Sequence, residues 1–337
     1  MNFSGLKRKI PKDYPYMYAR ISAKRAKLLD ERDYDDLLKM EPNQIAKRLE
    51  EGEYRKEIDQ LGARYDGVQL VELALNRNLS NTMRELSEMA PEPLSGIIEV
   101  YLRRFDILTL KRLLRWKKGS SNRDSKDMFI PISRYSFEEL SELMEKDYEQ
   151  IVEDISFPES RVDYQGFIDS KELSKVENSL DKAYSAELDQ LCQEVPSKRF
   201  RKFMEQELEH QNLVTALRLK KYGYEAEEIS KHFVNGHQTR LLTEIMEAEN
   251  LEEAMDLVVK SGRAKSTERL EELEHELEAD RLQNALTMVH AEPLGATSII
   301  GYVVAKQIEI KNLRMLIRAK ETGLQNTETI KKNLVIA

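Results

Sequence analysis

One helical string occurs three times in this chain, at intervals of about one hundred residues. The copies read "DILTLKRLLRWKKG" at residues 106–119, "EHQNLVTALRLKKYG" at 209–223 and "EIKNLRMLIRAKETG" at 309–323. Each copy places apolar residues at helical spacing and ends on a glycine, where a helix would stop. Tetratricopeptide and HEAT-type repeats run only about 34 to 47 residues, so the spacing favours a whole domain used three times.

The three strings agree in charge and residue type at fixed columns. With Thr109, Asn212 and Asn312 as position zero, the copies are separated by 103 and 100 residues. The shared columns are an acid at −3 (Asp106, Glu209, Glu309), leucine at +1 (Leu110, Leu213, Leu313), leucine or isoleucine at +5 (Leu114, Leu217, Ile317), arginine at +6 (Arg115, Arg218, Arg318) and lysine at +8 (Lys117, Lys220, Lys320). Looser matches precede them, because "RDYDDLLKM", "KDYEQIVED" and "ENLEEAMDL" begin at residues 32, 146 and 249.

The composition predicts helices throughout the chain. Only 13 glycines and 9 prolines occur in 337 residues, and 34% of the residues are charged, which is typical of long helices with short joints. A polar stretch at 117–127 and an Asn-Gly stretch at 233–239 interrupt the helical pattern. We therefore predict an all-α fold of three similar helical domains, 1–119, 120–235 and 236–337.

The repeated charges carry a geometric consequence. The acid and the arginine of one copy are nine residues apart, which places them on opposite sides of a helix and about 13.5 Å apart along its axis. They cannot pair with each other, so we expect them to join neighbouring helices or domains; the alternative is a solvated basic stripe. The candidate structural and interface charges are Asp106, Arg115, Lys117, Glu209, Arg218, Lys220, Glu309, Arg314, Arg318 and Lys320.

No arrangement of residues indicates catalysis. The nearest approach to a phosphate loop, residues 258–267, has valine and alanine at the positions that require glycine. His232 and His237 are poorly spaced for a metal, and no cysteine or carboxylate cluster completes a set. The single cysteine, Cys192, excludes an internal disulfide and has no nearby histidine to activate it. We expect no active site, no metal and no cofactor.

Charge and hydropathy limit the location of the chain. No stretch reaches the roughly 18 apolar residues of a membrane span, and the N-terminus lacks a secretory signal, so we expect a soluble intracellular protein. The net charge is −8, yet residues 1–28 carry eight basic residues against one acid. Such a basic end suits an acidic protein surface, anionic lipid or nucleic acid, and a merely solvated end is the alternative.

Two other classes of function compete at this point. Residues 103–118 contain seven basic residues with Phe105 and Trp116 between them, which would suit phosphate binding. However, the chain is acidic overall, contains no nucleic-acid-binding motif, and has a more mixed charge in the other two copies. A helical scaffold or adaptor without a mechanical role is the second alternative.

Three segments carry a family resemblance. They are "YMYARISAKRAKLLDERDYDDLL" at residues 16–38, "YLRRFDILTLKRLLRWK" at 101–117 and "AKQIEIKNLRMLIRAK" at 305–320. Together with the Asn-Leu-Arg-x-x-x-Arg-x-Lys ending they resemble the C subunit of the archaeal A-type ATP synthases, which is similar to the d subunit of vacuolar (V-type) ATPases. Thr109 departs from the asparagine of the other copies, and the second unit is the most diverged.

The resemblance implies both a fold and a role. It implies three similar helical domains around a pseudo-threefold axis, forming a funnel. It also implies a non-catalytic rotor subunit, one copy per complex, at the cytoplasmic face of the membrane. Its implied partners are the membrane proteolipid ring and the central-shaft subunits, with no nucleic acid and no small-molecule substrate. Whether protons or sodium ions drive the ring is not encoded in this subunit.

Overall fold

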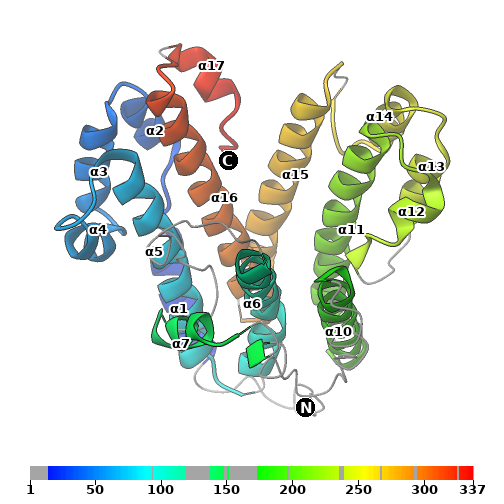
Figure 1. Ribbon diagram of the computed structural model, residues 1–337, viewed down its shortest axis with the longest axis horizontal. Coiled ribbons are helices and arrows are strands. Elements are labelled where there is room, and N and C mark those ends of the chain that lie inside the picture. Colours follow the sequence, from blue (N-terminus) through cyan, green and yellow to red (C-terminus); the bar gives the residue numbers. More distant parts are fainter. Residues whose placement is uncertain are drawn as a thin grey trace.

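The fold is entirely helical in the part of the chain that the structure describes (Figure 1), so the predicted all-α class is confirmed. This computed structural model describes residues 14–336 except for 93, 119–136, 148–149, 152–172, 196, 235–238, 266–267, 292–293 and 325. Most of the predicted linker at 117–127 and part of the Asn-Gly stretch at 233–239 lie outside the described residues.

Among the helices that the structure describes, six are long and the others are short. The long helices are α5 (Gly67–Met89), α6 (Leu94–Lys118), α10 (Leu173–Glu194), α11 (Lys198–Lys221), α15 (Leu270–Ala291) and α16 (Ala296–Glu321). The shorter ones are α1 (Tyr14–Arg25), α2 (Glu31–Leu37), α3 (Pro42–Glu50), α4 (Arg55–Leu61), α7 (Phe137–Glu145), α12 (Ala226–Ser230), α13 (Arg240–Glu247), α14 (Leu251–Lys260) and α17 (Thr327–Lys332). The three repeated strings end α6, α11 and α16, which we call the closing helices.

Local sequence signals set the ends of these helices. Asp30 caps α2, because its side chain accepts from the Asp33 N–H while Asp33 accepts from the Asp30 N–H, a capping box. Gly223 and Gly323 follow α11 and α16 with φ of 78° and 76°. This left-handed conformation suits glycine and lets the next residue's N–H bond back into the last turn, as Tyr224 N does to Leu219 O at 3.1 Å.

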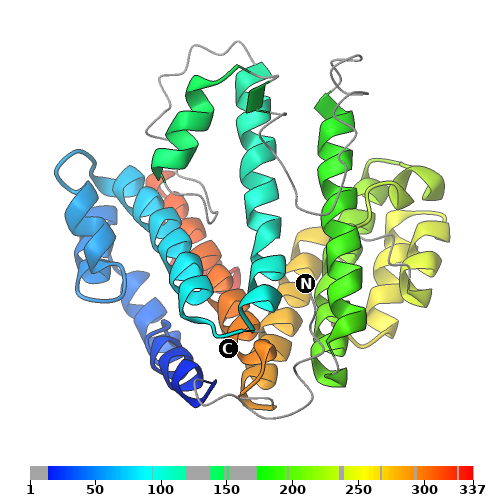
Figure 2. The ribbon, with the colours of Figure 1, turned by 90° about the horizontal axis from the view of Figure 1, so that it is seen from below.

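The long helices pack in pairs. Helix α16 lies along α5, α11 lies along α15, and α10 lies along α6. Helices α15 and α16 meet at their lower ends and separate toward the top of Figure 1. Figure 2 shows α6 projecting away from the lower end of α16. The closing helices thus approach one another at one end and diverge at the other.

A close contact between α15 and α16 depends on one glycine. A Cβ at Gly301 in α16 would lie 2.6 Å from the carbonyl oxygen of Ala285 and 2.7 Å from Val289 in α15. No side chain fits that space, so glycine permits the two backbones to approach. This contact positions α16 beside α15 at the base of the molecule.

In the described ranges, two apolar cores hold the helices together. The larger one joins α1–α6, α10, the N-terminal half of α11, the C-terminal part of α15 and nearly all of α16. The smaller one lies beneath α12–α14 and includes Leu213, Leu217 and Leu273. The repeated leucines at +1 are buried in all three copies, at Leu110, Leu213 and Leu313.

Candidate functional site

The acids of the −3 column lie on the buried side of the closing helices. Glu309 accepts from the Leu29 N–H at 2.6 Å, from the Tyr54 hydroxyl at 2.6 Å and from Lys306 Nζ at 2.8 Å. Lys306 is only 1% exposed, so each charge satisfies the other where water is excluded. Burial and the neighbouring Glu309 carboxylate raise the pKa of Tyr54 well above its ordinary value, so its hydroxyl stays protonated and donates.

The other two acids are also buried. Glu209 accepts from the Thr239 hydroxyl at 2.6 Å and forms an ion pair with Arg263. Asp106 is 4% exposed. In the second and third copies the acid therefore has hydrogen-bond partners from outside its own closing helix. Thr239, the partner of Glu209, is also the N-cap residue of α13.

The asparagines at position zero make the same contact twice. Asn312 donates to the Val335 carbonyl at 2.7 Å and accepts from the Val335 N–H at 3.0 Å. Asn212 does the same with Val234, at 3.1 and 2.9 Å. A side-chain amide can both donate to and accept from one backbone unit in this way. This pair of hydrogen bonds explains why asparagine occupies position zero in these two copies.

The lysines at +8 bind the ends of short helices. Lys220 Nζ donates to the Met246 carbonyl at 2.9 Å in α13, and Lys320 Nζ donates to the Leu38 carbonyl at 2.6 Å after α2. Both contacts place a cation at a helix C-terminus, which the helix dipole favours. Lys117 lies over the Trp116 ring, 5.4 Å from its centroid.

These lysine contacts correct one alignment of the repeats. The sequence pattern aligns the string at 249 with the string at 32, which forms most of α2. The lysines instead make α13 (Arg240–Glu247) the counterpart of α2, so that alignment is displaced by one helix. Short amphipathic helices with acidic first turns resemble one another, and their contacts distinguish them.

The arginines at +6 point to other long helices. Arg115 pairs with Glu177 of α10 at 2.6 and 2.7 Å, and Arg218 pairs with Glu274 of α15 at 2.7 and 2.8 Å, both in two-pronged contacts. Arg318 pairs with Glu72 of α5. The arginine side chains are 60–62% exposed, so each pair contributes little by itself.

The same three ion pairs connect the long helices in a closed order, because the last long helix of the chain pairs with the first. Helix α6 joins α10, and α11 joins α15, which in each case is the long helix just before the next closing helix. Helix α16 joins α5, the long helix just before α6. Beside two of these three pairs, which we call the outer pairs, there is a second contact one helical turn away. Lys111 lies 2.5 Å from Asp181, and Arg314 lies 2.5 Å from the Asn76 amide oxygen. The acid and the arginine of one copy therefore take different partners, on opposite sides of the helix.

One repeat position brings the three closing helices together. Position −5 is Arg104 in α6, Glu207 in α11 and Gln307 in α16. Arg104 donates to Gln307 Oε1 at 2.9 Å and lies 3.8 Å from Glu207. Arg281 of α15 completes the contact, with its Nη2 2.8 Å from Glu207 and 3.4 Å from Gln307. We call these four residues the central joint.

The central joint is charged and buried. Burial by itself raises the pKa of Glu207, but the charge and hydrogen bonds of Arg281, assisted by Arg104, hold it below its ordinary value. Burial by itself lowers the pKa of Arg281, and Glu207 more than offsets that effect. Both groups therefore stay ionised, and removing either one would take from the other its nearest partner of opposite charge in a place away from water.

No group in the described residues is arranged for catalysis. No cluster of histidine, cysteine and carboxylate side chains that could hold a metal occurs among them. Burial raises the pKa of Cys192 to about 11, so its thiol is a poor nucleophile at neutral pH. Across the same described ranges, no helix is both long and apolar enough to cross a membrane.

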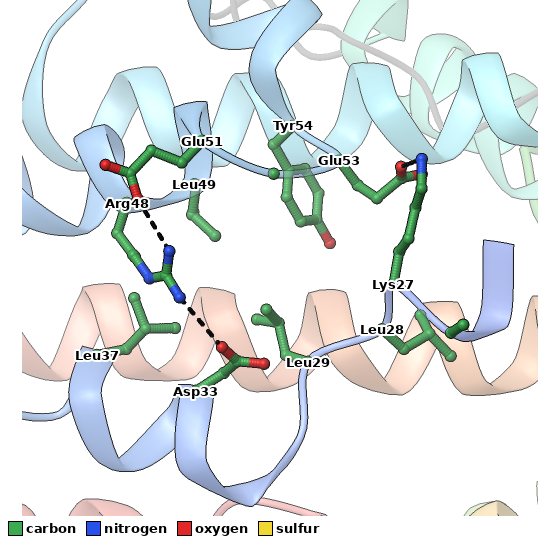
Figure 3. Close-up of a pocket in the computed structure, with 12 residues that line it drawn as sticks. Lys27, Leu28, Leu29, Asp33, Leu37, Arg48, Leu49, Glu51, Glu53 and Tyr54 are labelled. Carbon is green, nitrogen blue, oxygen red and sulfur yellow. Dashed lines mark hydrogen bonds and ion pairs between the residues drawn. The ribbon is translucent and has the colours of Figure 1, made fainter. Parts of the chain in front are cut away.

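A cavity of about 420 Å³ lies between the N-terminal end of α2 and the turn joining α3 to α4 (Figure 3). Its rim carries two charged links, Arg48 with Asp33 and Glu51, and Lys27 with Glu53 at 2.5 Å. Its remaining walls are largely apolar. The charged side chains named at this cavity therefore pair with one another.

The chain matches a known family model over nearly its whole length. A model described as "ATP synthase (C/AC39) subunit" matches residues 17–332. The chain belongs to this family. The matched range includes all three closing helices and the central joint.

Individual relatives agree with the family match. The chain is 33% identical to the A-type ATP synthase C subunit of Methanococcoides burtonii, over 96% of this chain and 94% of that protein. It is 32% identical to the C subunit of the A-type ATP synthase from Methanosarcina mazei, over 99% and 96%. A Haloquadratum walsbyi relative of the same name is 29% identical over 93% and 96%.

Membership of the family establishes the broad role. The chain is a subunit of an ATP synthase, a structural component and not an enzyme in its own right. Its partners are other subunits of that complex. The role predicted for the ten candidate charges, as joints between neighbouring helices or domains, stays a prediction; the contacts described above are made within this chain.

Proposed function

We propose that this chain is a central-stalk subunit of an A-type ATP synthase and couples the membrane proteolipid ring to the central shaft during ATP synthesis. It is expected to act peripherally at the cytoplasmic face of the membrane, in one copy per complex. The full-length similarity to C subunits of A-type ATP synthases carries this proposal.

The proposed architecture is three helical repeats, 1–119, 120–235 and 236–337, around a pseudo-threefold axis. The closed order of ion pairs supports it, because the last closing helix contacts the first long helix. The central joint supports it too, since one repeat position from each copy meets there. A stiff body with buried charge pairs suits the transmission of torque, because packed helical cores deform little under load.

Loss of coupling tests the proposal directly. Membranes that lack this protein should retain ATP hydrolysis in the detached catalytic head but lose ion-driven ATP synthesis. Mild-detergent purification should recover the full-length chain with the proteolipid and a shaft subunit. Recovery with neither, or intact ATP synthesis without the chain, would contradict the proposal and favour a scaffold role. Steeply salt-dependent binding to RNA by a chain free of these partners would favour the nucleic-acid alternative.

A further inference from the structure

The short helices that bind α11 follow it in the sequence. Residues between Val234 and Arg263 supply the partners of its acid at −3, its asparagine at zero and its lysine at +8. We call a closing helix, together with the short helices that bind these three positions, a packed unit. The second packed unit, which comprises α11 to α14, is therefore continuous along the chain.

The third packed unit is composed of two separate parts of the sequence. The asparagine of α16 binds Val335, which follows α17, but the acid and the lysine bind residues near the beginning of the chain. Leu29 and Tyr54 bind the acid, and Leu38 binds the lysine, across 255 to 282 residues of sequence. Helices α2 and α3 therefore occupy on α16 the place that α13 and α14 occupy on α11.

The correspondence holds at a constant offset of 209 residues. At that offset the N-caps of α2 and α3 match the N-caps of α13 and α14. The residue after α3 that binds the acid of α16 likewise matches the residue after α14 that binds the acid of α11. The matched positions are Asp30 with Thr239, Glu41 with Asn250, and Tyr54 with Arg263. Three separate structural roles agree in one register, which a chance similarity of short helices does not produce.

The second and third packed units differ at one connection. Val234 and Thr239 are five residues apart in the sequence. Their counterparts, Val335 and Asp30, are 305 residues apart in the sequence and yet line the same cavity of about 270 Å³. Side-chain and backbone contacts, and not a short length of chain, therefore hold α2 and α3 against α16.

The polar contact between these helices and α16 is buried. Glu309 is 5% exposed, Lys306 1% and Tyr54 2%. The Tyr54 hydroxyl donates to Glu309 and accepts from Lys306 Nζ at 2.9 Å. Breaking this group would therefore cost more stability than breaking an exposed ion pair.

We propose that residues 29–54, which we call the strap, complete the third packed unit and close the three repeats into a cycle. The strap fastens the first repeat to the third, beside the contact of α5 with α16. The sequence boundaries proposed above stay as they are, but the third packed unit takes α2 and α3 from the first repeat. The inference concerns the chain by itself, so its failure would leave the proposed function intact.

Exchanging the partners of the acid between the two units tests the correspondence. In α16 the cation beside Glu309 is Lys306, at position −6. In α11 that position is Gln206, and Arg263, after α14, supplies the cation. Lys306→Gln should lower the unfolding midpoint of the full-length chain by about 5 °C or more, because it removes a buried ion pair. Adding Tyr54→Arg should restore at least half of that loss, since residue 54 occupies the place of residue 263.

A cation elsewhere on the strap is the control. Asn43→Arg adds the same charge at an exposed position of α3 and should restore nothing to the Lys306→Gln variant. The reverse exchange is independent of the first: Arg263→Tyr should lower the midpoint, and adding Gln206→Lys should restore it. Restoration by Asn43→Arg as large as that by Tyr54→Arg, or no restoration in either exchange, would overturn the proposal.

A circular permutant of the whole chain tests the closure. Joining residue 337 to residue 1 and opening the chain between Val234 and Thr239 moves the missing connection from the third packed unit to the second. If contacts are sufficient to complete a unit, the permutant should fold, and its unfolding midpoint should stay within about 5 °C of that of the original chain. A permutant that fails to fold, or that unfolds in two separate transitions, would contradict closure by the strap.

Discussion

The outer ion pairs and the central joint use charge in opposite ways. The outer pairs repeat the same two residue types three times, arginine at +6 with a glutamate early in another long helix. The central joint uses arginine, glutamate and glutamine at one repeat position. The outer arginines are largely exposed, and the residues of the joint are mostly buried.

The difference follows from where each position lies. An outer arginine meets a different element, so the same pair can be copied without conflict. Residues at −5 meet one another, and three arginines or three glutamates within about 4 Å would repel strongly in a medium of low dielectric. Helices that converge at a shared point therefore have to differ there, even when the rest of the repeat is kept.

Glu207→Leu should have the largest effect. It leaves Arg281 buried with Glu278 as its remaining carboxylate partner, 3.1 Å away, and should reduce the free energy of unfolding by about 3–5 kcal/mol. Chemical denaturation measures the change. Glu205→Leu is the control, since Glu205 is exposed on the same helix and should change stability by about 0.5 kcal/mol or less. Equal effects at the two positions would contradict a buried joint.

Asn312→Ala should have an intermediate effect. It removes both hydrogen bonds to Val335 in a buried place, and we expect a loss of about 1–3 kcal/mol in the free energy of unfolding. Asn212→Ala should behave alike, because its contact with Val234 is the same. Asn43→Ala, at an exposed position of α3, serves as the control. If only one of the two asparagine variants lost stability, the two asparagine contacts would not be equivalent.

The outer arginines should each matter least. Arg218→Ala breaks a largely exposed pair with Glu274 and should cost about 0.2–1 kcal/mol at low salt. Because screening weakens exposed pairs, the cost should shrink in about 1 M salt, whereas that of Glu207→Leu should persist. Denaturation at the two salt concentrations measures both. A salt-independent cost at Arg218 would contradict the distinction between outer and central charges.

Acid should weaken the joint over a defined pH range. The pKa of Glu207 is lower in the folded chain than its ordinary value of 4.5, and Glu278 behaves likewise. The stabilisation they provide is complete above that value and is lost as the pH falls toward the folded pKa. The difference in stability between the unsubstituted chain and Glu207→Leu should therefore narrow below about pH 4. A difference that stays constant from pH 7 to about pH 3 would contradict this sign.

The sequence predicted the parts of the molecule that repeat. The composition was sufficient to predict an all-α fold, and the charge and leucine columns were sufficient to predict the three closing helices. Helix periodicity was sufficient to separate the acid from the arginine. The contacts at −5 were missed because a search for like residues overlooks a position that must differ in each copy. The only sign of these contacts in the sequence is that position −5 differs among three copies that agree at neighbouring positions.

The partners of the arginines were missed for a different reason. Glu72, Glu177 and Glu274 each lie near the start of a long helix, among apolar residues at helical spacing, a pattern common in any amphipathic helix. Sequence spacing also gave no warning that α16 pairs with α5, because 246 residues separate Arg318 from Glu72. The contact between the last long helix and the first depends on tertiary packing, and local periodicity carries no information about it.

A double-mutant cycle between Arg104 and Glu207 tests the convergence of the repeats most directly. Unfolding free energies are measured for Arg104→Leu, Glu207→Leu and the double variant. Since the two side chains share one buried network, we expect the effects to be non-additive by about 0.5–3 kcal/mol. Additivity within about 0.3 kcal/mol would mean that these repeat positions do not meet, and would contradict the central joint.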